Sequence, residues 1–346
     1  MPLSPSGLLL IAALAATGPA ATATAKSLTP PVSSAQAEQD TTQVPPTELD
    51  EIVVEGRPLA EATTDFVARV VSPPRNRGAA TWHRRVCVGV GNLQREAAEF
   101  VVDRIATVGE SVGLQVGWPR CEPRVFIVFA GDADAAARDL VEARGRQFRI
   151  GVSGADLGDD ALVAFQTTDR PVRWWQASVP VNAGTGRVVS RLPGQPPFVA
   201  GPELRRPADF GPQAIVDGAS RIRNSLRDDL SQVIIIVDVD RVAGVDLGAL
   251  ADYLAVISLA QIDPELDPGP YDTILSLFSE GASPPPGLTD WDRAFLQGLY
   301  SAEQIDEAAN GRIGNVARTM ADEIRAGQEW RPEEQREIHR CDGPCP

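Results

Sequence analysis

Residues Gln232–Pro264 read QVIIIVDVDRVAGVDLGALADYLAVISLAQIDP, and they join two apolar patterns of different period. The first part, Val233–Val239, is an almost unbroken run of β-branched residues, which predicts a strand buried on both faces. From Leu247 onward, apolar residues recur every three or four positions, which predicts a helix, and Asp246 is suited to cap its N-terminus. A buried strand followed closely by a buried helix forms a core, and an active-site helix often takes such a position.

Further strands and helices are predicted on both sides of this stretch. Strands are expected at Phe66–Ser72, His83–Gly91, Arg124–Ala130 and Pro171–Val181. Helices are expected from an N-cap at Asn92 to Val112, at Asp132–Ala143, at Tyr271–Phe278, at Thr289–Gln304 and at Ile313–Ile324. The order strand, helix, strand, helix predicts an α+β fold with mixed α/β layers.

The two ends of the chain differ in composition from its middle. Residues 1–25 have an apolar core, Leu8–Ala16, and end in small residues, which is typical of an export signal; a disordered Ala-rich terminus is the alternative. Residues 26–60 are rich in Pro, Thr and Ser and predict a disordered linker, and residues 329–346 form a loose, charged tail. Residues 61–328 are expected to fold as one α/β domain. We therefore expect an exported protein, with the periplasm as its compartment.

Charge and composition exclude several classes of function. The formal charge of −15 on 346 residues argues against a nucleic-acid partner, and it would also repel an anionic membrane surface. No apolar run reaches the ~20 residues that a membrane-spanning helix needs. The glycines at Gly89 and Gly91 lack the third glycine of a dinucleotide-binding loop, so no cofactor is expected. The chain has two histidines, His83 and His339, which leaves few ways to assemble histidine-dependent catalysis.

The four cysteines of this chain fit an oxidising compartment. We expect Cys87 to pair with Cys121, and Cys341 with Cys345, because Gly343-Pro344 allows the tail to turn back on itself. The alternative for Cys87 is a small, buried, unpaired side chain on a strand.

The order of the strand, the buried helix and the later segment Gly287–Tyr300, GLTDWDRAFLQGLY, resembles that of the zincin metallopeptidases. It also resembles a related, uncharacterised family of exported proteobacterial proteins. In such enzymes the helix carries two zinc-binding histidines four residues apart, a glutamate follows the first, and a turn delivers a third ligand. A downstream segment of the type LTxxDxxxLxxLY packs beneath the helix. The resemblance implies a zincin-like core with a short mixed sheet packed on a helix of the active-site type.

The residues that would bind zinc are missing from this chain. The resemblance places Ala251 and Ala255 at the two histidine positions, Asp252 at the glutamate, Ser258 at the turn glycine and Gln261 at the third ligand. Alanine cannot bind a metal, so we expect no metal and no catalysis at this helix. The resemblance then implies a pseudo-metallopeptidase with a binding or structural role in the cell envelope. A role as a partner subunit without its own ligand stays open, as does the oligomeric state.

A groove is the first candidate site. It would lie between the strand that carries Arg173, Trp174 and Trp175 and the central helix that carries Tyr253, and it would bind a peptide or an envelope protein. The two-residue period of a strand places Arg173 and Trp175 on one face, and Trp174 and Gln176 on the other. Such an aromatic pair can instead cover the core.

A carboxylate site is the alternative. Asp238 and Asp240 lie on the same side of the end of a buried strand, and Asp290 or Asp292 would complete a site for a divalent cation. That arrangement would make the protein a hydrolase or a transferase. The opposing interpretation is that the two strand-end acids are solvated or form an ion pair with Arg241.

Overall fold

The computed structural model describes residues 57–73, 78–117, 121–148, 157–189, 226–281, 283–301 and 309–329. The predicted export signal, nearly all of the predicted linker, and the tail with Cys341 and Cys345 lie outside the described residues. In the part of the chain that is described, none of the helices combines the length and the apolar character needed to cross a membrane.

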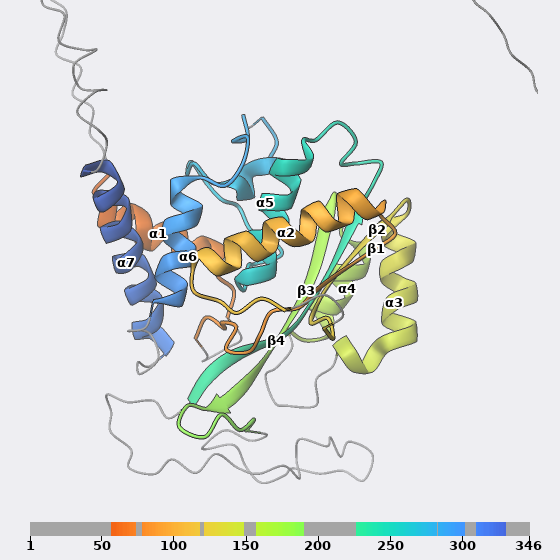
Figure 1. Ribbon diagram of the computed structural model, residues 1–346, viewed down its shortest axis with the longest axis horizontal. Helices are drawn as coiled ribbons and strands as arrows, with labels where there is room; N and C mark the ends of the chain where they lie inside the picture. Colours follow the sequence, from red (N-terminus) through yellow and green to blue (C-terminus); the bar gives the residue numbers. More distant parts are fainter. Residues whose placement is uncertain are drawn as a thin grey trace, which may run out of the picture. The chain divides into compact units, whose positions relative to one another are not determined.

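The described residues form a four-stranded mixed sheet with helices on both faces (Figure 1), which confirms the predicted α+β class. The strands are β1 (Val88–Gly91), β2 (Val125–Ala130), β3 (Val172–Asn182) and β4 (Leu226–Asp238). The helices are α1 (Leu59–Val70), α2 (Arg95–Ser111), α3 (Ala133–Phe148), α4 (Asp159–Thr167), α5 (Leu247–Leu259), the 3₁₀ helix η2 (Ile274–Phe278), α6 (Asp290–Tyr300) and α7 (Ala309–Glu329).

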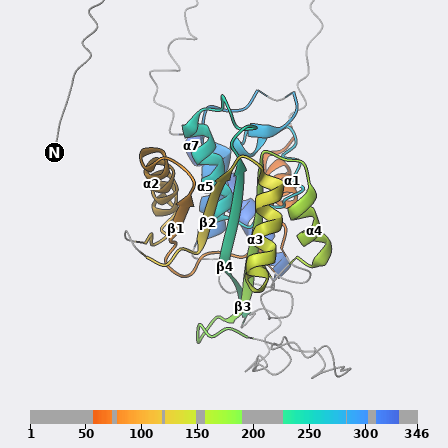
Figure 2. The same ribbon diagram turned by 90° about the vertical axis from the view of Figure 1, so that its right-hand side faces the viewer.

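The strands lie in the order β1-β2-β4-β3 (Figure 2). β1, β2 and β4 are parallel to one another, and β3 runs antiparallel to β4 at the end of the sheet. The predicted strand at Val233–Val239 is the second half of β4. Its first half, from Leu226, extends alongside the end of β3, where Leu226 is paired with Asn182.

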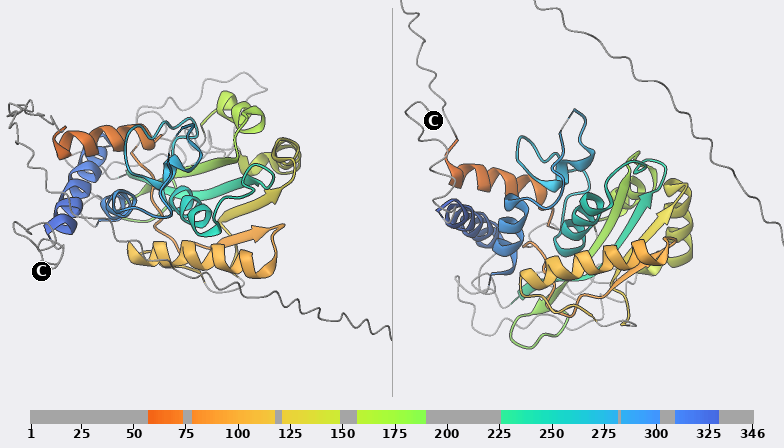
Figure 3. Two further views of the ribbon diagram at one scale, coloured as in Figure 1. Left: turned by 90° about the horizontal axis from the view of Figure 1, so that it is seen from above. Right: turned by 45° about the horizontal axis from the view of Figure 1, so that its top comes forward.

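Helices cover both faces of the sheet (Figure 3). The side chains of β4 alternate between two cores, as expected for a strand buried on both faces. Val233, Ile235 and Val237 belong to the main core, to which α2 and α5 contribute. Ile234 and Ile236 belong to a second core with residues of α3 and α4. The central strand is therefore enclosed by two helical layers.

Helices α1, α6 and α7 pack together beside α5 (Figure 1). Phe66 of α1 has no exposed surface and lies edge-on to Trp291 and Phe295, with ring centroids 5.5 and 5.8 Å apart. At the crossing of α6 with α7, Gly298 permits a close approach, because a Cβ atom there would come within 2.7 Å of the main-chain oxygen of Val316. This helical group completes the core around α5.

Several local predictions are wrong. Phe66–Ser72 is not a strand; it is the end of α1 and the residues after it, because Phe66 and Val70, one turn apart, are both buried against the core. Helix α2 begins at Arg95 after its N-cap Gln94, since Asn92 has a φ of 60° and lies in the left-handed region.

Among the other differences, two predicted segments are shorter in the structure and one helix was not predicted. The predicted strand at His83–Gly91 is limited to β1, because Val86 forms an isolated bridge to Val116 instead. Helix α4 lies in a glycine-rich stretch in which no helix was expected. The helix predicted at Tyr271–Phe278 is the shorter η2, which begins after its N-cap Thr273.

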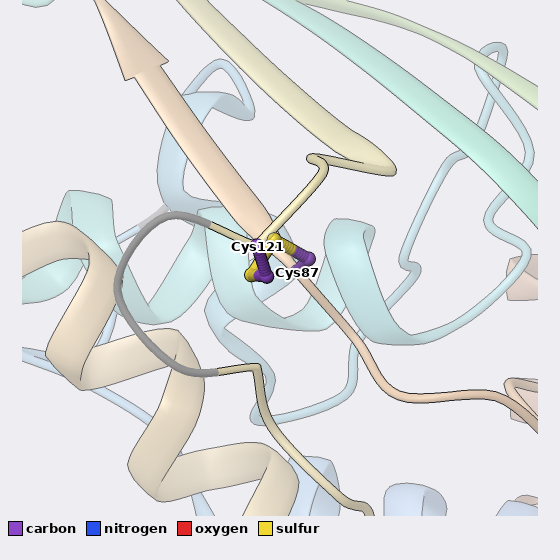
Figure 4. Close-up of a disulfide and its surroundings, with 2 residues drawn as sticks. All are labelled: Cys87 and Cys121. Atoms are coloured by element: carbon purple, nitrogen blue, oxygen red, sulfur yellow. A yellow bond between two sulfur atoms is a disulfide. The ribbon is translucent and has the colours of Figure 1, made fainter.

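Cys87 and Cys121 form a disulfide, as predicted (Figure 4). Cys87 directly precedes β1, and Cys121 lies just before β2. The main-chain N–H groups of Arg124 and Val125 donate to the carbonyl oxygen of Cys87, at 2.9 and 3.0 Å. A Cβ atom at Gly117 would collide with the Cys121 sulfur, so the chain passes the disulfide at a glycine. The bond ties the outermost strand to the segment that enters β2.

Candidate functional site

Helix α5 is buried along nearly its whole length. Its N-cap is Asp246, as predicted, whose carboxylate accepts hydrogen bonds from the N–H groups of Gly248 and Ala249, at 2.8 and 3.1 Å. Every residue from Ala249 to Leu259 is buried. At the two positions that the zincin resemblance assigns to histidines, Ala251 and Ala255 are 0% exposed. A helix that is apolar around its whole circumference belongs to the interior of a protein.

Asp252, at the position of the glutamate, is held by two other segments. It is 2% exposed, and its Oδ2 atom accepts hydrogen bonds from Arg104 Nη2 of α2 and from the N–H of Leu288, both at 2.8 Å. Arg104 Nε donates to Oδ1, which makes the ion pair bidentate. A Cβ atom at Gly287 would come within 2.8 Å of Oδ2, so the glycine leaves room for this contact. Asp252 therefore joins α2, α5 and the segment before α6.

The ion pair is electrostatically stable. The hydrogen bonds that Arg104 donates to Asp252 raise the pKa of the Arg104 guanidinium above its usual value. Both carboxylate oxygens already have donors.

The remaining positions of the zincin pattern also make structural contacts. Gln261 is 3% exposed, and its Oε1 atom accepts a hydrogen bond from the N–H of Ala80 at 3.2 Å. The carbonyl oxygen of Ser258 accepts the indole N–H of Trp82 at 2.8 Å. The Ser258 hydroxyl is buried without a partner among the described residues.

The end of α5 is fastened to β3 by side chains that point toward the helix. Gln176 Nε2 donates to the carbonyl oxygens of Ile257 and Ala260, both at 2.6 Å, and its Oε1 atom accepts from the N–H of Ile262 at 2.9 Å. The Trp174 indole donates to the carbonyl oxygen of Ile262 at 3.0 Å. These bonds satisfy carbonyl groups that a helix end leaves without partners.

A cavity of about 320 Å³ lies where the start of β3 meets α5 and the segment around η2. We call it the aromatic pocket, and define it by Trp174, Tyr253 and Phe278 with Arg170 and Leu266. The Tyr253 ring lies 6.4 Å from the Trp174 ring and 5.1 Å from the Phe278 ring, edge-on in both cases. Arg170 forms an ion pair of 2.7 Å with Glu265 beside the pocket. The walls are thus aromatic and the rim is charged.

The Tyr253 hydroxyl can serve a ligand. None of the described residues forms a hydrogen bond with it. Burial raises the pKa of the Tyr253 phenol well above its ordinary value. The hydroxyl therefore stays protonated and is able to donate or accept a hydrogen bond.

Arg173 and Trp175 lie on the opposite face of the sheet and do not line the aromatic pocket. Arg173 donates to the carbonyl oxygen of Phe165 at 3.0 Å and forms an ion pair with Asp134. The Trp175 ring packs against Phe148 and Phe165, with centroids 6.0 and 6.2 Å apart. Of the four residues considered for the groove, the structure brings Trp174 and Tyr253 together.

Of the two strand-end carboxylates of the alternative site, that of Asp238 acts in a local turn. Asp238 Oδ1 accepts hydrogen bonds from the N–H groups of Asp240 and Arg241, at 3.1 and 3.3 Å. Asp240 itself is exposed. The guanidinium of Arg241 forms an ion pair with Asp169.

The two carboxylates of α6 lie elsewhere in the fold. Asp290 is exposed and 3.3 Å from Arg293. Asp292 is 1% exposed and forms a capping box with Thr289; it also accepts from Thr273 Oγ1 and from the N–H of Ile274. Burial raises the pKa of Asp292, although its hydrogen bonds oppose that shift. Across the residues that are described, no three or more His, Cys, Asp or Glu side chains gather closely enough to hold a metal.

Sequence reasoning missed the partners of Asp252. Arg104 is 148 positions away and Leu288 is 36 positions away, so no local pattern connects them. The available signal was the acid itself, because a carboxylate inside an apolar helix requires a partner.

None of the protein-family models, curated proteins or solved structures compared with this chain matches it.

Proposed function

We propose that this is an exported, non-catalytic protein of the cell envelope, which binds a peptide or a protein segment through the aromatic pocket. One observation carries the proposal: an aromatic pocket with an unused hydroxyl lies beside a helix whose metal-ligand positions are buried alanines. The scaffold is proposed to be related to that of the zincin metallopeptidases.

The lack of catalysis is supported by how the helix uses its polar group. Asp252 is the one carboxylate within α5, and it is engaged by Arg104 and Leu288. Ala251 and Ala255 offer methyl groups where the family has imidazoles. Among the described residues, this helix therefore presents neither a metal ligand nor an available base to a substrate.

The pocket suits a large apolar side chain of a peptide. Its volume is about 320 Å³. Binding sites for protein segments often use one apolar anchor in a deep pocket, and aromatic walls supply contact area at a low entropy cost. The Tyr253 hydroxyl adds one hydrogen bond, and the ion pair of Arg170 with Glu265 offers polar contacts at the rim.

Export is supported by the disulfide between Cys87 and Cys121, since disulfides persist in oxidising compartments and are rare in the cytosol. The apolar segment near the start of the chain adds to this proposal. Fusion of residues 1–25 to a reporter enzyme that is active only after export tests it. Reporter activity no higher than that of a leaderless fusion would contradict export.

Peptide binding can be tested with a matched pair of neighbouring residues. A random peptide display library is panned against the purified protein, and the dissociation constant of an enriched peptide is measured by calorimetry. Trp174→Phe should weaken binding, whereas Trp175→Phe should leave it within about twofold, because Trp175 faces the other core. Tyr253→Phe removes only the hydroxyl and should weaken binding by ~5-fold, the usual value of one hydrogen bond.

Three results would contradict the proposal. The first is that no peptide is enriched, and the second is that both tryptophan variants bind equally well. The third is tightly held zinc in the purified protein, with peptidase activity that is lost when the zinc is removed.

A further inference from the structure

A second cavity, of about 200 Å³, lies at the opposite end of β4 from the aromatic pocket. It forms where the segment before β1 runs beside β4, with Thr81 in a parallel bridge to Asp229. We call it the His83 pocket, and define it by His83, Arg227, Trp82 and Leu114. It is separate from the site proposed above, and of the segments that carry the zincin resemblance only the end of Gly287–Tyr300, with Leu299 and Tyr300, lines it.

Three charged or ionisable side chains meet at this pocket. Asp229 is the central one, and its side chain is 8% exposed. Its Oδ1 atom lies 3.1 Å from His83 Nδ1 and 2.8 Å from Arg227 Nε, and its Oδ2 atom lies 3.3 Å from Arg227 Nη2. Burial acts to raise the pKa of Asp229, but the hydrogen bonds from His83 and Arg227 outweigh it and hold the pKa below its ordinary value. An ionised carboxylate thus orients both nitrogen groups.

One nitrogen of each group remains for a ligand. Asp229 engages His83 through Nδ1, and Arg227 through Nε and Nη2. In the described part of the chain, nothing is hydrogen-bonded to His83 Nε2 or to Arg227 Nη1. The two side chains are 22% and 18% exposed, and both line the cavity.

The unused donor of Arg227 and the balance of charge select the ligand. The negative charge of Asp229 offsets the positive charge of Arg227, so the cluster suits a singly charged group better than a phosphate dianion. Apolar side chains also line the cavity, among them Trp82, Leu114 and Leu299, together with the polar residues Thr81 and Ser301.

We propose that the His83 pocket binds a small carboxylic acid with an apolar body. Its carboxylate accepts a hydrogen bond from Arg227 Nη1, in the charge-assisted geometry that a guanidinium forms with a carboxylate, and lies beside the His83 ring. Its apolar body lies against Leu114 and Leu299. The cavity of about 200 Å³ limits the ligand to a compact acid.

The experiment uses benzoate and hexanoate as probes, with benzamide as the neutral counterpart of benzoate. Binding to the full-length protein is followed by calorimetry and by changes in indole NMR signals, since Trp82 lines the cavity. At least one of the two acids should bind, and benzamide should bind at least tenfold more weakly than benzoate if benzoate is the acid that binds. Arg227→Gln should weaken binding at least tenfold, and His83→Gln should weaken it severalfold.

Two further variants make the result unambiguous. Arg95→Gln removes the same charge from an exposed position of α2, where Arg95 is 83% exposed, and should bind as the wild type does. Leu114→Trp leaves the charged cluster intact but fills the cavity, and it should abolish binding even if Arg227→Gln fails to fold. The proposal is wrong if neither acid binds, if benzamide equals benzoate, or if a folded Leu114→Trp variant binds as the wild type does.

Discussion

The ion pair between Arg104 and Asp252 should stabilise the fold in an asymmetric way. The Asp252 side chain is 3% exposed and that of Arg104 is 37% exposed, so the acid depends on the pair more than the base does. Arg104→Met leaves a buried carboxylate with Leu288 N–H as its remaining described donor. Removing one partner of a buried pair costs about 3–5 kcal/mol, and we expect the lower end because water reaches Arg104.

Replacing the acid of the pair should lower the free energy of unfolding by less than replacing the base. Asp252→Asn keeps an oxygen that can accept the N–H of Leu288, and it leaves Arg104 where water can hydrate the guanidinium. We therefore expect a loss of about 1–2 kcal/mol. The double variant should lose less than the sum of the two single losses, by about 1–2 kcal/mol, because the second substitution removes a partner that is already lost.

Urea unfolding at neutral pH, followed by circular dichroism, measures these differences. Arg95→Met on the same helix is the matched control; its contact with Glu99 is long, at 3.9 Å, and both side chains are exposed. The control should change the free energy of unfolding by no more than ~0.5 kcal/mol. If Arg104→Met costs no more than this control, or if the two losses simply add, Asp252 does not join α2 to α5 as described.

Three further predictions concern stability. Gly298→Ala should destabilise the fold by about 1–3 kcal/mol, because its Cβ atom would come within 2.7 Å of a main-chain oxygen of α7. In the control Gly314→Ala, the added Cβ atom has no heavy atom within 4 Å, so the variant should be as stable as the wild type or more stable. Thermal melts of the two variants measure the difference. Reduction of the disulfide, whose cysteines are 34 positions apart, should lower the free energy of unfolding by about 4 kcal/mol on the chain-entropy relation, and an unchanged urea midpoint would contradict this. Because the folded pKa of Asp229 lies below its ordinary value of 3.8, its ionised form stabilises the fold above that pH, and this contribution is lost as the pH falls through the folded pKa. The free energy of unfolding of the wild type should therefore exceed that of Asp229→Asn by less below pH 3.8 than at neutral pH. Urea unfolding of both proteins at the two pH values measures this difference.

Local patterns predicted the elements whose burial is regular. The β-branched run of β4 and the cap of α5 at Asp246 each have a signal within a few residues. The strand prediction for Phe66–Ser72 was wrong because the apolar residues of this segment fit the period of a strand and that of a helix. The helical form is favoured by packing of Phe66 against Trp291 and Phe295, which are more than two hundred positions away.

The candidate site was predictable in composition but not in geometry. The alanines at positions 251 and 255 can be read directly from the sequence, and strand alternation separates Trp174 from Trp175. The sequence does not reveal that Asp252 forms an ion pair with Arg104, or that Asp229 contacts both His83 and Arg227 at one end of β4. Such contacts join distant segments, and they follow from the tertiary packing of the sheet and its helices.

The sealed surroundings of α5 restrict how this chain can evolve. A histidine at Ala251 or Ala255 would enlarge a side chain that has no free space around it and would bury ring nitrogens without partners. Metal binding there would need both replacements, the release of Asp252 from Arg104 and a wider passage near Gly287. Each of these steps is destabilising alone. Variants with only some of them would fold poorly and would not yet bind a metal, so selection would not favour them.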